Sequence, residues 1–170
     1  MVAPTLPGLA DGDDPRRFTL EDTVDFLVDL LDGHDLTDVT LVAHSWGGYP
    51  VFGAAHRVPH RVRRLVFHSA FVPENGVLLV EDVPPGHAAL FRQLAQESGD
   101  HSALSTLGLP VSYLSGECDL AMPPGDYAWC PRFPALLGVE PITVPGDHEA
   151  FLTRPDAFVA ALLHSHTVDG

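Results

Sequence analysis

The segment 40–48, Thr-Leu-Val-Ala-His-Ser-Trp-Gly-Gly, constrains the fold of this chain more than any other. Residues 39–43 are mostly apolar and largely β-branched, which predicts a short buried strand. The small residues around Ser45 predict a sharp turn into a helix. This is the form of the G-x-S-x-G turn, which exposes a serine at the end of a strand, with Ala43 in place of the first glycine. Ser45 is therefore a candidate nucleophile, and the alternative is a serine in an ordinary turn, since short motifs also match by chance.

Helical and strand patterns alternate on both sides of this turn. Apolar residues recur at helical spacing from Leu20 to Leu31, after a capping box formed by Thr19 and Asp22 and before a stop near Gly33. The alternation predicts a single α/β domain over 1–170 with a mostly parallel, doubly wound sheet. The other expected elements are helices over 46–57, over 88–98 and from Pro155 onward, strands over 62–68, 111–115 and 142–144, and loops over 1–18, 69–76 and 118–138, the last with at most a short helix.

Composition excludes several classes of partner. The chain has 9 arginines, no lysine and 23 acidic residues, for a net charge of −14, so we expect no nucleic-acid partner and no anionic membrane surface. No apolar run approaches the ~18–20 residues of a membrane span, and the N-terminus lacks a signal-peptide pattern, which predicts a cytoplasmic protein. We expect Cys118 and Cys130 to be free thiols. No cluster has metal-ligand spacing, so no metal is predicted.

A serine nucleophile needs a base and a group that orients the base. In a doubly wound sheet such groups gather where the strands end. Asp119 follows the third predicted strand and His148 follows the fourth, which gives the order serine, acid, histidine. The alternatives are Glu117 as the acid and a surface role for His148, one of ten histidines. His44, directly before Ser45, is expected to shape the site rather than to titrate in it.

Five segments carry a family resemblance: 3–8, 43–48, 70–76, the loop around residue 119, and 146–155. Together they resemble the α/β-hydrolase superfamily, and within it the small-molecule carboxylesterases, the group of plant methyl esterases and hydroxynitrile lyases. The resemblance implies that Ser45 is the nucleophile, His148 the general base, Asp119 the orienting acid, and the Trp46 N–H one oxyanion donor. It implies a small-molecule ester or other apolar ligand and no cofactor. The lyase branch has a lysine where Glu149 stands here, which counts against cyanohydrin chemistry.

The chain departs from the family pattern in two places. The family has a strand ending in His-Gly, between a strand around Val2-Ala3 and the strand at 39–43, and the loop after it gives the second oxyanion N–H. No such segment occurs here, so we expect an N-terminally shortened hydrolase whose strand 39–43 is an unpaired edge. Such an edge favours pairing with another chain in a homo-oligomer. We also expect a shortened cap, reduced to a lid segment over 77–109.

The predicted function is a serine hydrolase that cleaves a small apolar carboxylic ester through an acyl-enzyme. Loss of one oxyanion donor lowers rates by about 10²–10³. The alternatives are therefore a hydrolase-fold protein that binds a small ligand with weak or no turnover, or a cyclase or lyase of secondary metabolism that uses the same triad.

Overall fold

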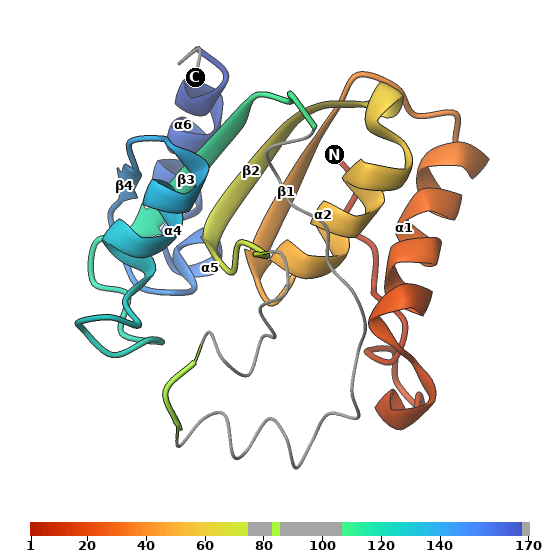
Figure 1. Ribbon diagram of the computed structural model, residues 1–170, viewed down its shortest axis with the longest axis horizontal. Coiled ribbons are helices and arrows are strands. Elements are labelled where there is room, and N and C mark those ends of the chain that lie inside the picture. Colours follow the sequence, from red (N-terminus) through yellow and green to blue (C-terminus); the bar gives the residue numbers. More distant parts are fainter. Residues whose placement is uncertain (75–82, 86–106, 168–170) are drawn as a thin grey trace.

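The computed structural model describes residues 1–74, 83–85 and 107–167, in which a parallel sheet lies between helices on its two faces (Figure 1). Its strands are β1 (Val39–Ser45), β2 (Val62–Ala70), β3 (Val111–Gly116) and β4 (Ile142–Val144). They lie side by side in the order β1-β2-β3-β4, and every neighbouring pair is parallel. The predicted parallel, doubly wound sheet is confirmed.

The sheet buries both of its faces, as a parallel sheet must. On β2, Leu65 and Phe67 join the core that includes residues of α2 (Gly48–Arg57) and α4 (Trp129–Leu137). Val66 lies between them in sequence and joins a second core, against α6 (Pro155–Ser165). This period of two places successive side chains on opposite faces. The helices that cover the sheet therefore hold the strand ends from both sides.

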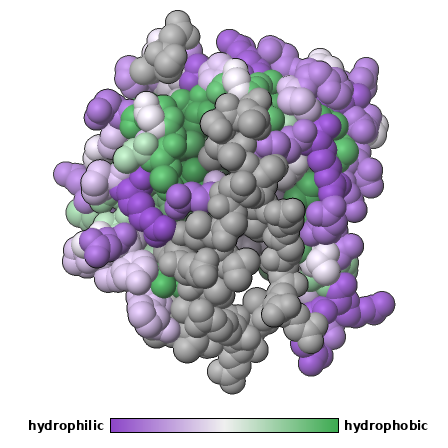
Figure 2. Space-filling view, in the orientation of Figure 1, coloured by the Kyte–Doolittle hydropathy of each residue, from purple (hydrophilic) through white to green (hydrophobic). Residues whose placement is uncertain are grey.

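Helix α1 (Leu20–Gly33) matches its prediction closely. The Thr19 N–H donates to the Asp22 carboxylate at 2.7 Å, and the Asp22 N–H donates to Thr19 Oγ1 at 3.1 Å, so the capping box is present. The helix buries Val24, Leu27 and Leu31 and packs against α2. Its outer face is charged, and Figure 2 shows hydrophilic side chains along this side of the molecule.

Residues 118–138 are expected to form a loop with at most a short helix, and that helix is α4, Trp129–Leu137. Cys130 has a non-helical backbone near the start of α4, and Pro134 lies inside the helix. Phe133 is nevertheless fully buried against the sheet. Burial of this aromatic side chain outweighs the local preference of the prolines, since helices in proteins are stabilised mainly by packing.

Other boundaries differ by two residues. Helix α2 begins at Gly48 rather than residue 46, because residues 45–47 make the turn, and β1 and β2 each run two residues further than expected. Three short elements were not predicted: the 3-10 helices η1 (Pro15–Arg17) and η2 (Pro59–Arg61), and α5 (Ala150–Thr153). The helix expected over 88–98 and most of the reduced lid over 77–109 lie outside the described residues.

Strand β1 is the edge of the described sheet, as predicted. Among the described strands it pairs only with β2, and residues 1–6, where the family pattern places a strand, form none. Val42 on this strand is 41% exposed. Cys118 and Cys130 are both free, as expected. None of the described helices is long and apolar enough to cross a bilayer.

Candidate active site

Ser45 sits at the end of β1 in a left-handed conformation, with φ of +52°. The turn is closed by the Gly47 N–H, which donates to the His44 carbonyl at 2.8 Å. A Cβ atom on Gly48 would lie 1.9 Å from the Phe71 carbonyl oxygen, so only glycine fits where α2 begins. A left-handed conformation costs a residue with a side chain roughly 1–2 kcal/mol. Strain of this kind gathers at functional sites, and it is present at the residue that the motif indicates.

Asp119 and His148 meet in a side-chain hydrogen bond, with 2.9 Å between Asp119 Oδ2 and His148 Nδ1. The Asp119 side chain is only 2% exposed, whereas the alternative acid, Glu117, is exposed. Burial by itself would raise the pKa of Asp119. Hydrogen bonds with His148, Ser69 and the Ala121 N–H outweigh burial and bring that pKa below its usual value. Asp119 is therefore held as a carboxylate.

The loops after β3 and β4 are bound to each other, and this brings the acid and the histidine together. The Glu117 N–H donates to the Val144 carbonyl at 2.9 Å, and the Cys118 N–H donates to the Gly146 carbonyl at 2.8 Å. A Cβ atom on Gly116 would lie 2.5 Å from the Asp147 carbonyl oxygen. Glycine at the end of β3 thus permits the close approach on which the Asp119–His148 pair depends.

The imidazole of His148 is packed between two aromatic rings. It stacks on Trp129, with 5.3 Å between ring centroids and 16° between planes, and its centroid lies 4.4 Å from that of His44. Because Nδ1 faces Asp119, Nε2 is the nitrogen left for proton transfer. Ser45 Oγ has no hydrogen bond to a described side chain, His148 included. Contacts of this kind are often long in a free enzyme and shorten when substrate binds.

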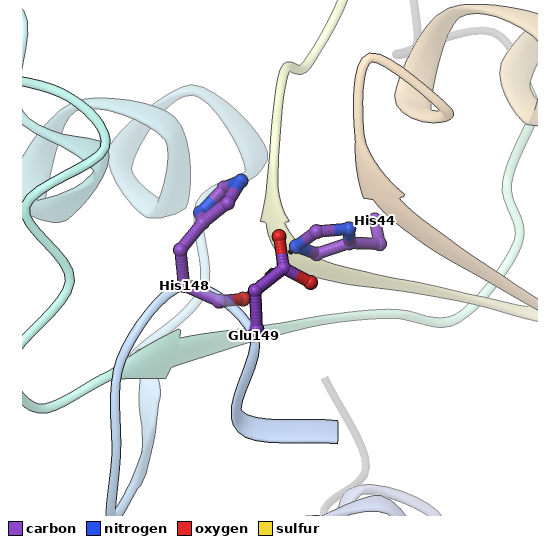
Figure 3. Close-up of side chains that lie close together, drawn as sticks. All are labelled: His44, His148 and Glu149. Atoms are coloured by element: carbon purple, nitrogen blue, oxygen red, sulfur yellow. Dashed lines mark hydrogen bonds between the residues drawn. The ribbon is translucent and has the colours of Figure 1, made fainter. Parts of the chain in front are cut away.

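His44 lies beside the loop that carries His148 and contacts its backbone (Figure 3). Its Nε2 lies 3.0 Å from the backbone oxygen of His148. Burial lowers the pKa of His44, and the neighbouring His148 lowers it further. His44 is therefore neutral near pH 7 and can donate to that carbonyl, which agrees with the expectation that it shapes the site.

Figure 3 also shows the one group of metal-ligand type among the described residues: His44, His148 and Glu149, whose candidate ligand atoms lie within 4.8 Å of one another. One nitrogen of each ring is already engaged, by the His148 carbonyl and by Asp119 respectively. Glu149 is exposed. Ligands of a tetrahedral zinc ion lie much closer together than this, and we assign no metal to these residues.

The Trp46 N–H, the expected oxyanion donor, lies in the turn between Ser45 and α2. Among the described residues, the neighbouring Gly47 and Tyr49 N–H groups are bonded to the His44 and Trp46 carbonyls, whereas no described carbonyl accepts the Trp46 N–H. An unengaged N–H near the start of a helix is suited to a developing negative charge.

A hollow of about 310 Å³ lies at the other end of the sheet and does not belong to this site. It is lined by residues at the start of β3 and the end of α4, Leu109, Val111, Leu137 and Val139 among them. These positions are at the amino ends of the strands, whereas the candidate site residues lie at the carboxyl ends, where doubly wound proteins bind their ligands.

Ser69 is a site residue that the sequence did not reveal. It is fully buried at the end of β2, and its hydroxyl is hydrogen-bonded to the Asp119 carboxylate. The only local signal is a small polar residue between the apolar strand and Ala70. That signal does not distinguish it from the first residue of a loop, which is where it was expected.

Comparison with known proteins identifies the family. A family model described as the alpha/beta hydrolase fold matches residues 2–97. The chain belongs to this family. The predicted resemblance is confirmed at this level.

The matches to curated relatives cover only part of each relative's length. A carbendazim hydrolyzing esterase of Nocardioides sp. (strain SG-4G) is 39% identical over 80 residues, which are 45% of this chain and 33% of the relative. A haloalkane dehalogenase of Mycolicibacterium smegmatis is 35% identical over 96 residues, or 55% of this chain and 30% of the relative. The matched part of the chain thus spans about a third of the length of these proteins.

Solved structures with the same fold cover nearly the whole chain. An extracellular alpha/beta-hydrolase from a Paenibacillus species, described as homologous in structure and function to tobacco salicylic acid binding protein 2, superposes with a TM-score of 0.86. That match covers 95% of this chain and 85% of the other, at 24% identity. Polyneuridine aldehyde esterase in its H244A form superposes with a TM-score of 0.66 at 14% identity, covering 90% and 82% of the two chains. At these identities the likeness concerns the fold.

Proposed function

We propose that the protein is a serine hydrolase that cleaves a small, mostly apolar carboxylic ester through an acyl-enzyme. The observation that carries the proposal is the hydrogen-bonded pair of Asp119 and His148, located at the same edge of the sheet as the left-handed Ser45. Each of the three follows or ends a different parallel strand, in the chain order serine, acid, histidine. This arrangement is typical of nucleophilic acyl transfer on this fold.

Each residue has a defined role in this mechanism. Ser45 Oγ attacks the ester carbonyl while His148 Nε2 takes its proton, and the Trp46 N–H stabilises the oxyanion. His148 then returns the proton to the departing alcohol, which leaves Ser45 acylated. Water, deprotonated by His148, cleaves the acyl-enzyme and releases the acid. Asp119 keeps the Nδ1 proton in place and stabilises the imidazolium formed in each half-reaction.

The apolar character of the substrate is inferred from the rings around His148. Trp129 stacks on the imidazole, and Phe151 packs on the neighbouring His44 at 4.8 Å between centroids. Trp46, next to the nucleophile, is 37% exposed. The exposed ring of Trp46, beside a histidine packed among aromatic rings, favours an apolar acyl or alcohol group. The esterase names of several similar proteins agree with an ester as the substrate.

The test is hydrolysis of p-nitrophenyl acetate and butyrate by the protein and by Ser45→Ala, together with mass spectrometry after a fluorophosphonate probe. We expect turnover and a probe adduct on Ser45, and loss of both in the variant. Ser165→Ala removes a buried hydroxyl that bonds the Leu162 carbonyl in α6, and this control should retain activity. Equal rates for the protein and Ser45→Ala would contradict the mechanism.

A second candidate is a protein that binds the same ligand class without turnover. It is favoured by the position of β1 at the edge of the described sheet. No described strand lies on the open side of β1, where a following loop would supply a second oxyanion donor. Binding of an apolar ester measured by calorimetry, with no adduct after the fluorophosphonate probe, would support this candidate over the hydrolase.

A further inference from the structure

Strand β2 carries an irregularity beside the candidate site. Its parallel register with β1 pairs His44 with His68 and then Ser45 with Ala70, so Ser69 is left without a partner across the strand pair. Pairing resumes after it, because the Phe71 N–H donates to the Ser45 carbonyl at 3.1 Å. Ser69 is thus the extra residue of a β-bulge. Bulges of this kind often lie next to active sites, where they redirect a side chain.

The backbone of Ser69 is as unusual as that of Ser45. Its φ is +41°, and it is fully buried. A left-handed residue with a side chain costs roughly 1–2 kcal/mol, so neighbouring strands both end in a strained serine. The motif accounts for Ser45 but gives no reason for Ser69.

The hydroxyl of Ser69 lies between the ends of two strands. Its Oγ lies 3.5 Å from the backbone nitrogen of Gly116, and Gly116 is the last residue of β3. The hydroxyl is also hydrogen-bonded to the Asp119 carboxylate. Asp119 already accepts from His148 on Oδ2 and from the Ala121 N–H on Oδ1. A buried carboxylate with donors on several sides has one orientation, because rotation would break charge-assisted hydrogen bonds.

We propose that Ser69 is a positioning residue, whose hydroxyl fixes the Asp119 carboxylate in the orientation that holds His148 for proton transfer. The expected effect of Ser69 on turnover rests on the proposed function. The bulge in β2 exists, on this view, to turn a serine hydroxyl toward the strand that carries the acid. Each of the four strands then contributes one polar residue at or just beyond its end: Ser45, Ser69, Asp119 and His148.

The test combines Ser69→Ala and Ser69→Gly. Both remove the hydroxyl, while glycine relaxes the left-handed backbone and alanine does not. We expect both to lower kcat/KM for p-nitrophenyl butyrate about tenfold, since hydrogen bonds to charged groups are the stronger ones. We expect the acid limb of the pH profile to move to higher pH, because a carboxylate that has lost a donor stabilises the imidazolium more. Ser112→Ala is the control: it removes a buried hydroxyl that accepts from Arg64, away from the site.

A readout independent of turnover keeps this inference separate from the proposed function. The pKa of the Asp119 carboxyl, followed by ¹³C NMR, should rise in both Ser69 variants and stay unchanged in Ser112→Ala. If the protein does not hydrolyse esters but this titration moves, the proposed function fails and the placement of Ser69 stands. An unchanged Asp119 titration and pH profile in both variants, or wild-type behaviour of Ser69→Gly alone, would overturn the inference.

Discussion

On the α1 side of the molecule, charged side chains lie at the surface and apolar ones inside, whereas the carboxyl ends of the strands bury ionisable groups. Arg57 joins α2 to α1 through ion pairs with Glu21 and Asp25. At the strand ends, the Asp119 side chain is almost fully buried. His68 is fully buried too, and neither of its ring nitrogens has a hydrogen-bond partner in the described part of the chain.

Backbone conformation differs in the same way. Helix α1 begins with a complete capping box. At the strand ends, Ser45 and Ser69 both adopt left-handed conformations that residues with side chains rarely take. The comparison teaches that one region is arranged for stability, while the other accepts strain and burial to bring polar groups together. Substitutions in the two regions should therefore affect different quantities.

The largest expected effect is on activity, from Asp119→Asn. Without the carboxylate, His148 loses the acceptor that fixes its tautomer, and kcat/KM should fall by about 10³–10⁴-fold. Glu117→Gln, in the same loop but exposed, is the matched control and should lose little. Steady-state hydrolysis of p-nitrophenyl butyrate measures both. A larger loss in Glu117→Gln would exchange the roles of the two acids.

On the α1 side, Leu31→Ala should act on stability alone. Leu31 is 3% exposed, and its truncation leaves a cavity between α1 and its neighbours. We expect the free energy of unfolding to fall by about 2–5 kcal/mol, with kcat/KM of the folded protein unchanged. Urea titration measures the first quantity, and Asp29→Ala on the exposed face of α1 is the control. A change in kcat/KM would show that the two regions are coupled.

Acid should destabilise the protein through His68. Burial is the main cause that lowers the pKa of His68 from 6.5 to about 4, and the nearby His44 and His148 contribute to the same shift. The unfolded chain therefore binds more protons than the folded one between these values. Stability is complete above pH 6.5 and decreases as the pH falls toward 4, by about 3 kcal/mol. Urea titrations at pH 7 and 4.5 should show this loss. His68→Leu should reduce it, while the exposed His60→Gln should not.

The smallest effect, and the one of opposite sign, is expected for Ser45→Gly. Glycine adopts φ of +52° without strain, so the free energy of unfolding should rise by about 1 kcal/mol although the proposed nucleophile is lost. Thermal unfolding followed by circular dichroism measures this gain. A variant less stable than the wild type would mean that the Ser45 side chain contributes more packing than strain.

The sequence predicts the features of the fold that depend on local signals. The capping box of Thr19 and Asp22, the apolar spacing of α1 and the β-branched strands each depend on residues close in the chain. The order of Ser45, Asp119 and His148 was also readable, because parallel strands bring their carboxyl ends to one edge. Family resemblance added the roles, which stay predictions until the kinetic tests are done.

Features that depend on how distant strands pair were not readable. Ser69 gains its position from a register shift between β1 and β2, and no pattern within either strand encodes that shift. The short helix allowed within 118–138 had no predicted bounds, because the prolines of α4 argue locally for a loop, while the burial of Phe133 that stabilises α4 is a tertiary contact. Both gaps have one cause: propensity describes a segment alone, whereas packing and register belong to pairs of segments.

The sequential order β1-β2-β3-β4 has a consequence for how the molecule assembles. Asp119 and His148 are 29 residues apart along the chain, and a contact that closes a loop of this length forms later than the local contacts within a helix. β4 is the last of the described strands along the chain, and its pairing with β3 brings His148 to Asp119. In a refolding experiment, the Asp119–His148 hydrogen bond should therefore report completion of the sheet, after the helical signal of α1 has been regained.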